Sequence, residues 1–112
     1  MTVLKKATDH YRSQVGGELM SIEVPEWETT VYFKQYSNFM TEQKIIEYHN
    51  DGKLAEALVE TLIQKALDED GKKLFRQADR ATLLREVDPN IIIRVCTAIN
   101  QGKEEVEADL GN

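Results

Sequence analysis

The chain has 112 residues, of which 41% are hydrophobic and 30% charged, and its formal net charge is −6. This composition is typical of a single soluble globular domain and excludes a disordered chain. No apolar run approaches the roughly 20 residues of a membrane-spanning helix, and there is no basic stripe of the kind that binds nucleic acid. Because no apolar run follows the first lysines, we predict no signal peptide and a cytoplasmic location.

A short helix is predicted over residues 2–14, with fraying of the terminus as the alternative. Gly16 and Gly17 end the helical pattern. The first twelve residues carry a net charge of +2 and the last twelve a net charge of −3, so the charge is unevenly placed. The apolar residues of the helix stand at helical spacings: Val3, Leu4, Ala7 and Tyr11.

An antiparallel β-hairpin is predicted next. Met20, Ile22 and Val24 alternate with polar residues, which is the spacing of a half-buried strand. Pro25 lacks a backbone donor, so this strand must stop or lie at an edge there. A second run, residues 29–36, is rich in β-branched and aromatic residues, and the short loop between the two runs favours a hairpin.

The two faces of the second strand differ. Val31 and Phe33 would face one side, where helices must cover them because a two-stranded ribbon is only marginally stable alone. Tyr32 and Tyr36 would face the other side, where no cover is evident, and exposed aromatics beside a sheet edge are common protein-contact residues. Trp27 lies between the strands, and two roles stay open for it, a lid on the core or a contact residue.

A helix is predicted to begin at Thr41 as N-cap, with Glu42 in its first turn, where the helix dipole favours a negative charge. The sequence Asn-Asp-Gly at residues 50–52 breaks it. The residues expected along one face of this helix are Ile45, Ile46 and His49.

The next helix, residues 53–67, has a broad apolar stripe of the core-facing kind. Glu56, Glu60 and Lys65 are expected on its solvent side. The apolar residues of the stripe are Leu54, Ala55, Leu58, Val59, Leu62, Ile63, Ala66 and Leu67.

An acidic turn follows, and a calcium loop is one interpretation of it. Asp68 and Asp70 have the first spacing of an EF-hand, but Gly71 comes too early, Lys72 takes the fifth position and Asp79 the twelfth. We therefore predict a solvated turn in which glycine supplies a positive φ.

Leu74 and Phe75 are predicted to anchor the next segment in the core. Asp79 is the expected cap of a helix over residues 78–87. The inward residues of that helix would be Leu83, Leu84 and Val87.

Asp88 followed by Pro89 is a specific start signal for the last helix. Ile91 and Ile93 make that helix apolar on most sides, so it is either central to the core or partly covered by a partner subunit. Residues 101–112 are predicted to form a flexible acidic tail. The inward residues at helical spacing are Ile92, Val95, Cys96 and Ile99.

Together these elements predict a mostly helical α+β fold, in which an N-terminal antiparallel β-hairpin packs on a small bundle of about four helices. Residues 1–100 would form one domain, followed by the acidic tail.

No catalytic, cofactor-binding or metal-binding residues are predicted. His10 and His49 stand in different elements without metal-ligand spacing, and no serine has the setting of a nucleophile elbow. Cys96 is expected to be a small buried hydrophobe, with a reactive thiol as the alternative. The predicted sites are protein contacts at Trp27, Tyr32, Tyr36, Ile91 and Ile93.

The chain resembles the tail assembly chaperones of long-tailed bacteriophages over roughly residues 7–112. The resemblance lies in a strand that ends in Val-Pro-Glu-Trp, a second strand of Thr-Val-Tyr-Phe-Lys type, and the segment Ala-Leu-Asp-Glu-Asp-Gly-Lys-Lys-Leu-Phe at residues 66–75. The final apolar helix with a short acidic tail also fits.

This resemblance implies a non-enzymatic role in building a phage tail, in the host cytoplasm. Such chaperones coat the tape measure protein until tail tube protein polymerises around it. The resemblance further implies a frameshift-extended form of the same protein and self-association into a homo-oligomer. Open spiral assemblies are the form that head-to-tail contacts give when they do not close.

Two other classes of function remain open on the residues alone. A small cytoplasmic adaptor or inhibitor unrelated to tail assembly would use the same aromatic surface. A metal-dependent enzyme would require Asp68 or His49 to bind an ion.

Overall fold

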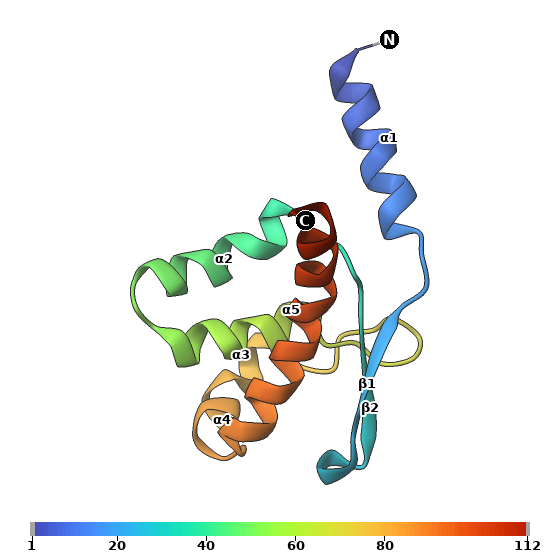
Figure 1. Ribbon diagram of the computed structural model, residues 1–112. Helices are drawn as coiled ribbons and strands as arrows, with labels where there is room; N and C mark the ends of the chain where they lie inside the picture. Colours follow the sequence, from blue (N-terminus) through green and yellow to red (C-terminus); the bar gives the residue numbers. More distant parts are fainter. Residues whose placement is uncertain (1, 112) are drawn as a thin grey trace.

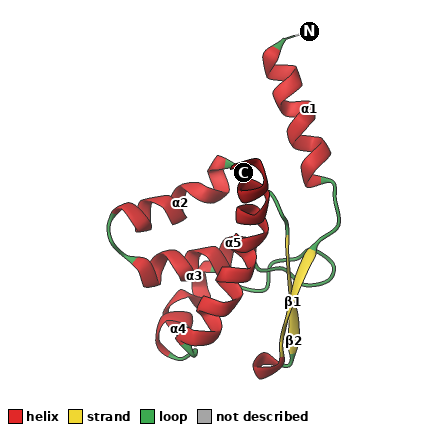
Figure 2. Cartoon of the chain, in the orientation of Figure 1, coloured by secondary structure: helices red, strands yellow, loops and turns green. Residues whose placement is uncertain are grey.

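An N-terminal helix, a two-stranded hairpin and a group of packed helices follow one another in the computed structural model, which describes residues 2–111, with side chains as far as Gln101 (Figure 1, Figure 2). The mostly helical α+β fold predicted from the sequence is confirmed. The elements are α1 (Val3–Val15), β1 (Met20–Val24), the 3₁₀ turn η1 (Pro25–Trp27), β2 (Thr29–Phe33), α2 (Phe39–Asn50), α3 (Leu54–Lys65), the 3₁₀ turn η2 (Gln77–Asp79), α4 (Arg80–Arg85) and α5 (Pro89–Gly111).

The hairpin has the predicted inward face. β1 and β2 pair antiparallel, with Met20 opposite Phe33 at the open end. Val24 and Val31 are fully buried, and Phe33 is buried as well. The second strand is shorter than predicted, because it ends at Phe33 and does not continue to Tyr36.

The outer edge of β2 is covered by the segment after α3. The backbone N–H of Tyr32 donates to the carbonyl of Leu67 (2.9 Å), and the N–H of Leu67 donates to the carbonyl of Tyr32 (2.8 Å). The same segment turns back on itself, since the N–H of Leu74 donates to the carbonyl of Ala66 (3.1 Å). An edge strand with satisfied backbone groups does not offer itself for pairing with another chain.

The core is centred on α3, against which α2, α4 and α5 all pack (Figure 1). The first turn of α3 is an exception to the predicted stripe. Leu54 is 61% exposed, because α3 begins at the periphery beside the turn from α2. The buried cluster consists of Val24, Val31, Phe33, Val59, Leu62, Ile63, Ala66, Leu83, Ile92, Val95, Cys96 and Ile99.

The start of α2 was predicted wrongly. Asn38, and not Thr41, is the N-cap, because its side-chain oxygen accepts the backbone N–H of Thr41 (2.9 Å). The helix therefore begins three residues earlier than a cap at Thr41 would allow. It buries Ile45 alone, while Ile46 and His49, predicted on the same face, are exposed.

Glu60 was predicted on the solvent side of α3 and is instead completely buried. Its carboxylate accepts the side-chain amides of Gln64 (2.8 Å) and Gln77 (2.9 Å) and forms an ion pair with Arg80. Arg80 also pairs with Glu56 (3.0 Å), which is half-buried. The prediction failed because η2 and α4 fold over this face of α3 and bring their own polar groups with them.

The segment around α4 follows the prediction in part. Asp79 precedes α4, but its carboxylate accepts the backbone N–H of Arg76 (2.8 Å) and so closes η2. Leu83 is buried and Val87 is half-buried, whereas Leu84 lies at the surface.

The predicted start of α5 is confirmed, since the Asp88 side chain accepts the backbone N–H of Asn90 (2.9 Å). Its predicted inward residues, Ile92, Val95, Cys96 and Ile99, are all buried. The backbone of α5 continues as a helix to Gly111. The side chains after Gln101 lie outside the described residues, so the flexible acidic tail stays a prediction.

The acidic turn after α3 is closed by its own residues. One carboxylate oxygen of Asp68 accepts the backbone N–H groups of Asp70 and Lys72, both at 2.9 Å. Gly71 has a φ of +81°, which is the positive value expected there.

The buried ion pair gives a first prediction. Arg80→Met should lower the free energy of unfolding by about 3 kcal/mol, because it leaves the Glu60 carboxylate buried without a compensating charge. Urea denaturation followed by circular dichroism measures this loss. The double variant Arg80→Met/Glu60→Gln should regain more than half of it, since the buried charge is gone. A single-variant loss below about 0.5 kcal/mol would contradict the assignment.

The buried thiol gives a second prediction. Burial raises the pKa of Cys96 from its ordinary value of 9.0 to about 12. The thiol of the unfolded chain therefore ionises first, so the contribution of Cys96 to stability should be fully present below pH 9 and be lost as pH rises from 9 toward 12. Between pH 8 and pH 10, the wild type should lose about 1 kcal/mol more than Cys96→Ala in urea denaturation. Equal losses would refute this contribution.

Candidate protein-contact surface

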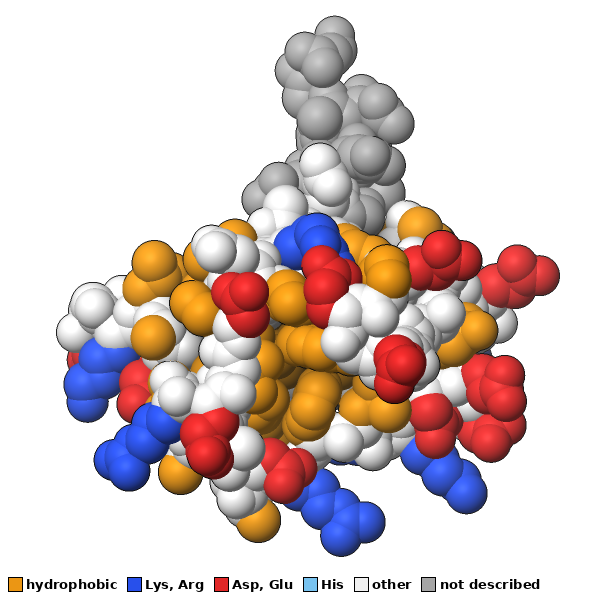
Figure 3. Space-filling view, turned by 90° about the horizontal axis from the view of Figure 1, so that it is seen from below, with side chains coloured by type: hydrophobic (Ala, Val, Ile, Leu, Met, Phe, Trp, Pro, Cys, Tyr) orange, Lys and Arg blue, Asp and Glu red, His pale blue; other side chains and the backbone are white. Residues whose placement is uncertain are grey.

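An apolar groove of about 350 Å³ opens between the hairpin turn and α4. In the view from below, hydrophobic side chains gather at the centre of this face, and acidic and basic side chains stand around them (Figure 3). Apolar clefts with polar margins are the usual contact sites for helices and other apolar segments of partners. The groove is lined by Trp27, Thr29, Leu74, Phe75, Leu83 and Val87.

Two aromatic rings form one wall of the groove. Trp27 and Phe75 meet edge to face, with ring centroids 6.0 Å apart and an interplanar angle of 79°. Both are half-buried and pack against the core. Trp27 therefore covers the core, as the lid interpretation expects, and also lines the open groove. Its role as a contact residue stays a prediction.

An ion pair fixes the turn that carries Trp27. Both terminal guanidinium nitrogens of Arg94 (Nη1 and Nη2), on α5, donate to the carboxylate of Glu26, at 2.8 and 2.6 Å. The Arg94 hydrogen bond lowers the pKa of Glu26 from 4.5 to about 2. The next residue after the turn, Glu28, has a φ of 52°, in the left-handed region. The pair joins residues 68 positions apart and so ties the hairpin tip to the last helix.

An acidic depression of about 610 Å³ adjoins the groove, since Thr29 lines both. Tyr32, a predicted contact residue, is half-buried in this depression. No lysine or arginine is among the lining residues of the depression. Its carboxylates belong to Glu23, Glu28, Asp68 and Glu69.

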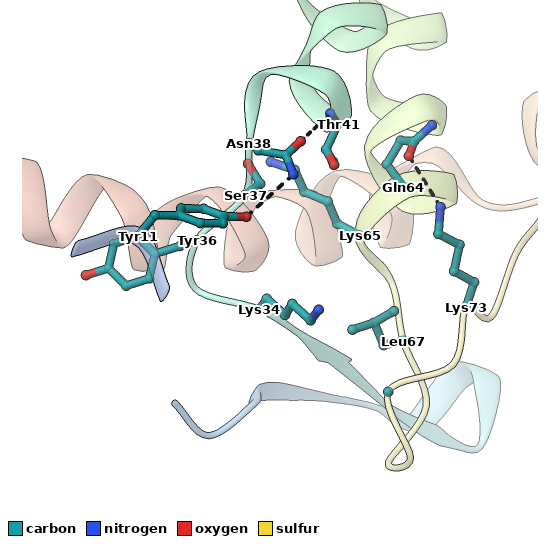
Figure 4. A pocket seen from close by; sticks show the side chains of 11 residues that line it. Tyr11, Lys34, Tyr36, Ser37, Asn38, Thr41, Gln64, Lys65, Leu67 and Lys73 are labelled. Atoms are coloured by element: carbon teal, nitrogen blue, oxygen red, sulfur yellow. Dashed lines mark hydrogen bonds between the residues drawn. The ribbon is translucent and has the colours of Figure 1, made fainter. Parts of the chain in front are cut away.

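Tyr36 lies apart from the groove and the acidic depression. It lines a polar pocket of about 260 Å³ near the end of α1, together with Tyr11 and three lysines (Figure 4). Lys65 pairs there with Glu42 (2.7 Å). The pocket therefore contains an internal ion pair beside Leu67 and the two tyrosine rings. The three lysines are Lys34, Lys65 and Lys73.

The two predicted contact residues of α5 also lie away from the groove lining. Ile91 packs against the core, whereas Ile93 is 47% exposed. The structure thus brings none of the predicted contact residues together in one site: Trp27 lines the groove, whereas Tyr32 lines the acidic depression. The sequence analysis missed Leu74, Phe75, Leu83 and Val87 as groove residues, because it assigned them to the core alone.

No group of three metal-ligating side chains is close enough to hold a metal ion among the residues with described side chains. Within the same part of the chain, no helix is long and apolar enough to cross a membrane. Comparison with known protein families, curated proteins and solved structures finds no match to the chain.

The ion pair at the hairpin tip gives a third prediction. In a carbon-detected NMR titration, the Glu26 carboxyl should titrate with a midpoint near pH 2, because Arg94 stabilises its charged form. In Arg94→Met the midpoint should rise toward 4.5, and in the control Arg85→Met it should stay near 2. The stabilisation by this pair is present above pH 4.5 and is lost as pH falls toward 2. An unchanged midpoint in Arg94→Met would rule out the pair.

Proposed function

We propose that this protein is a non-enzymatic phage tail assembly chaperone that binds the tape measure protein through the apolar groove. One observation carries the proposal. Two sequence segments that resemble the tail assembly chaperones, Val-Pro-Glu-Trp and residues 66–75, lie far apart in the chain but meet at this groove. They contribute Trp27, Leu74 and Phe75 to its lining.

The groove has the properties that such a client requires. A tape measure protein is long and helical by this resemblance, and a helix binds a groove by inserting side chains spaced three and four residues apart. The aromatic wall supplies a rigid contact area, because Trp27 and Phe75 are held edge to face. The net charge of −6 helps to keep the protein soluble while one apolar cleft stays open among charged side chains of both signs (Figure 3).

Tail tube protein and a frameshift-extended form of the same chain are the further partners in this proposal. The extended form would carry its additional domain on the C-terminal side of the chain. The groove lies on the hairpin and α4, so an addition at the C-terminus leaves its lining residues unchanged. The host cytoplasm is the corresponding site of action.

Co-expression with the tape measure protein of the same gene cluster tests the proposal. The wild type should bring this client into the soluble fraction and co-purify with it. Thr29→Arg should reduce co-purification at least about tenfold, because an exposed groove residue becomes a long charged one that fills the cleft. The matched control is Thr82→Arg, an exposed position on α4 outside the groove lining, which should bind like the wild type.

The possible outcomes test the chaperone function and the groove as its binding site separately. If the wild type fails to solubilise or bind the client, the chaperone proposal is refuted and an adaptor for another partner takes its place. If both variants bind equally well, the client uses another surface. Circular dichroism of each variant confirms that the fold is intact.

A further inference from the structure

The polar pocket near the end of α1 gathers lysine side chains around one cavity (Figure 4). Its volume is about 260 Å³, and Lys34, Lys65 and Lys73 reach it from three separate segments of the chain. Among the described residues that line this pocket, none is an aspartate or a glutamate. The pocket therefore differs in charge from the chain as a whole, whose formal net charge is −6. A cavity with a surplus of cationic groups attracts anions.

Two of the three lysines are not neutralised within the described part of the chain. The ammonium group of Lys65 is paired with the carboxylate of Glu42 (2.7 Å). Lys73 donates to the side-chain oxygen of Gln64 (3.3 Å), which is a neutral partner. Neither Lys34 nor Lys73 has an ion pair with a described residue. The pocket therefore has two positive charges that a bound anion would neutralise.

Further polar groups reach the same cavity from α1 and from the start of α2. The Asn38 amide donates to the Tyr11 hydroxyl at 3.5 Å, which is at the limit of hydrogen-bond distance. The Tyr11 hydroxyl only accepts in this bond, so its own O–H can still donate to a ligand. Thr41 lines the pocket from the first turn of α2, where the helix dipole favours a negative charge.

We propose that this pocket binds a small anion with two acidic groups, phosphoryl or carboxylate, which pair with Lys34 and Lys73 and are covered by Tyr11. Each of these lysines would pair with one acidic group, because the two side chains lie on different sides of the cavity (Figure 4). The volume restricts the ligand to a small molecule, since pockets for drug-sized molecules have roughly 300–1,000 Å³. The site does not depend on the proposed function, because no described residue lines both this pocket and the apolar groove.

A ligand in this pocket would also hold α1 in place. The helix projects from the body of the molecule and has no buried residue (Figure 1). Two glycines, Gly16 and Gly17, follow it and allow the chain to bend there. Among the described lining residues, Tyr11 is the one that α1 contributes. An anion that accepts the Tyr11 O–H would therefore add a contact between α1 and the rest of the protein.

Isothermal titration calorimetry with pyrophosphate tests the site. The titrations are made at constant ionic strength, because added salt screens every exposed charge. The wild type should bind one pyrophosphate per chain. Lys34→Gln and Lys73→Gln should each weaken this binding about tenfold, because each removes one charge-assisted hydrogen bond. A parallel titration with succinate, which has two carboxylates, identifies whether phosphoryl or carboxylate groups bind more tightly.

The matched control for these variants is Lys72→Gln. Lys72 is exposed and adjoins Lys73 in the sequence, but it lies outside the lining of the pocket. Its replacement removes the same charge from the chain, so this variant should bind pyrophosphate like the wild type. An equal loss of affinity in all three variants would overturn the proposal in favour of nonspecific attraction. The absence of saturable binding for both pyrophosphate and succinate would overturn it as well.

Hydrogen exchange measured by mass spectrometry tests the part played by Tyr11. Saturating pyrophosphate should slow exchange of the α1 amides at least about twofold in the wild type, because the helix gains a contact with the body of the protein. Tyr11→Phe, which lacks the hydroxyl, should show no such slowing. Unchanged exchange in the wild type would overturn the assignment of Tyr11 as the cover of the ligand. Both measurements omit the tape measure protein, so failure here leaves the chaperone proposal standing.

Discussion

A buried carboxylate determines how the helices are arranged. A charged group inside a protein costs several kcal/mol unless it is paired and hydrogen-bonded, and Glu60 finds its cation on the segment that folds over it. Arg80 reaches this carboxylate from the first turn of α4, which packs on α3. The same guanidinium lies 5.2 Å from the ring centroid of Tyr48 and so also contacts α2. One cation thus fixes three helices, and with them the groove wall that contains Leu83.

The opposite wall of the groove is fixed by different means. Its aromatic residues are held where the hairpin tip meets α5, through the pair of Glu26 and Arg94, and where the segment after α3 joins β2 at Leu67. The two ion pairs are not equivalent. The pair on α3 is buried and tolerates no loss of its partner, whereas the pair at the tip is exposed and is screened by salt. The hairpin wall is therefore the wall that can adjust to an occupant.

Local sequence signals predicted the elements of this fold well, and contacts distant in sequence limited the prediction of the site. Proline at position 25 and the alternation before it defined the end of β1, because both act within a few residues. The cap of α2 was predicted at Thr41, a good capping residue, whereas the backbone geometry, which a sequence does not show, places the cap at Asn38. Glu60 was predicted on the solvent side, because helical periodicity carries no information about which other segments cover a helix. The groove was not predictable, since its lining comes from three separate segments that only the tertiary fold brings together.

The left-handed residue at the hairpin tip has a consequence for how this turn can change. Glu28 has a side chain at a φ of 52°, where only glycine is free of steric cost, so the position gives up roughly 1 kcal/mol. Replacement by glycine would remove that strain, but it would also remove one of the carboxylates of the acidic depression. A glycine at this position would relieve the backbone strain, whereas glutamate at this position retains the negative charge. A variant selected for stability alone is therefore expected to alter the electrostatic margin of the groove first.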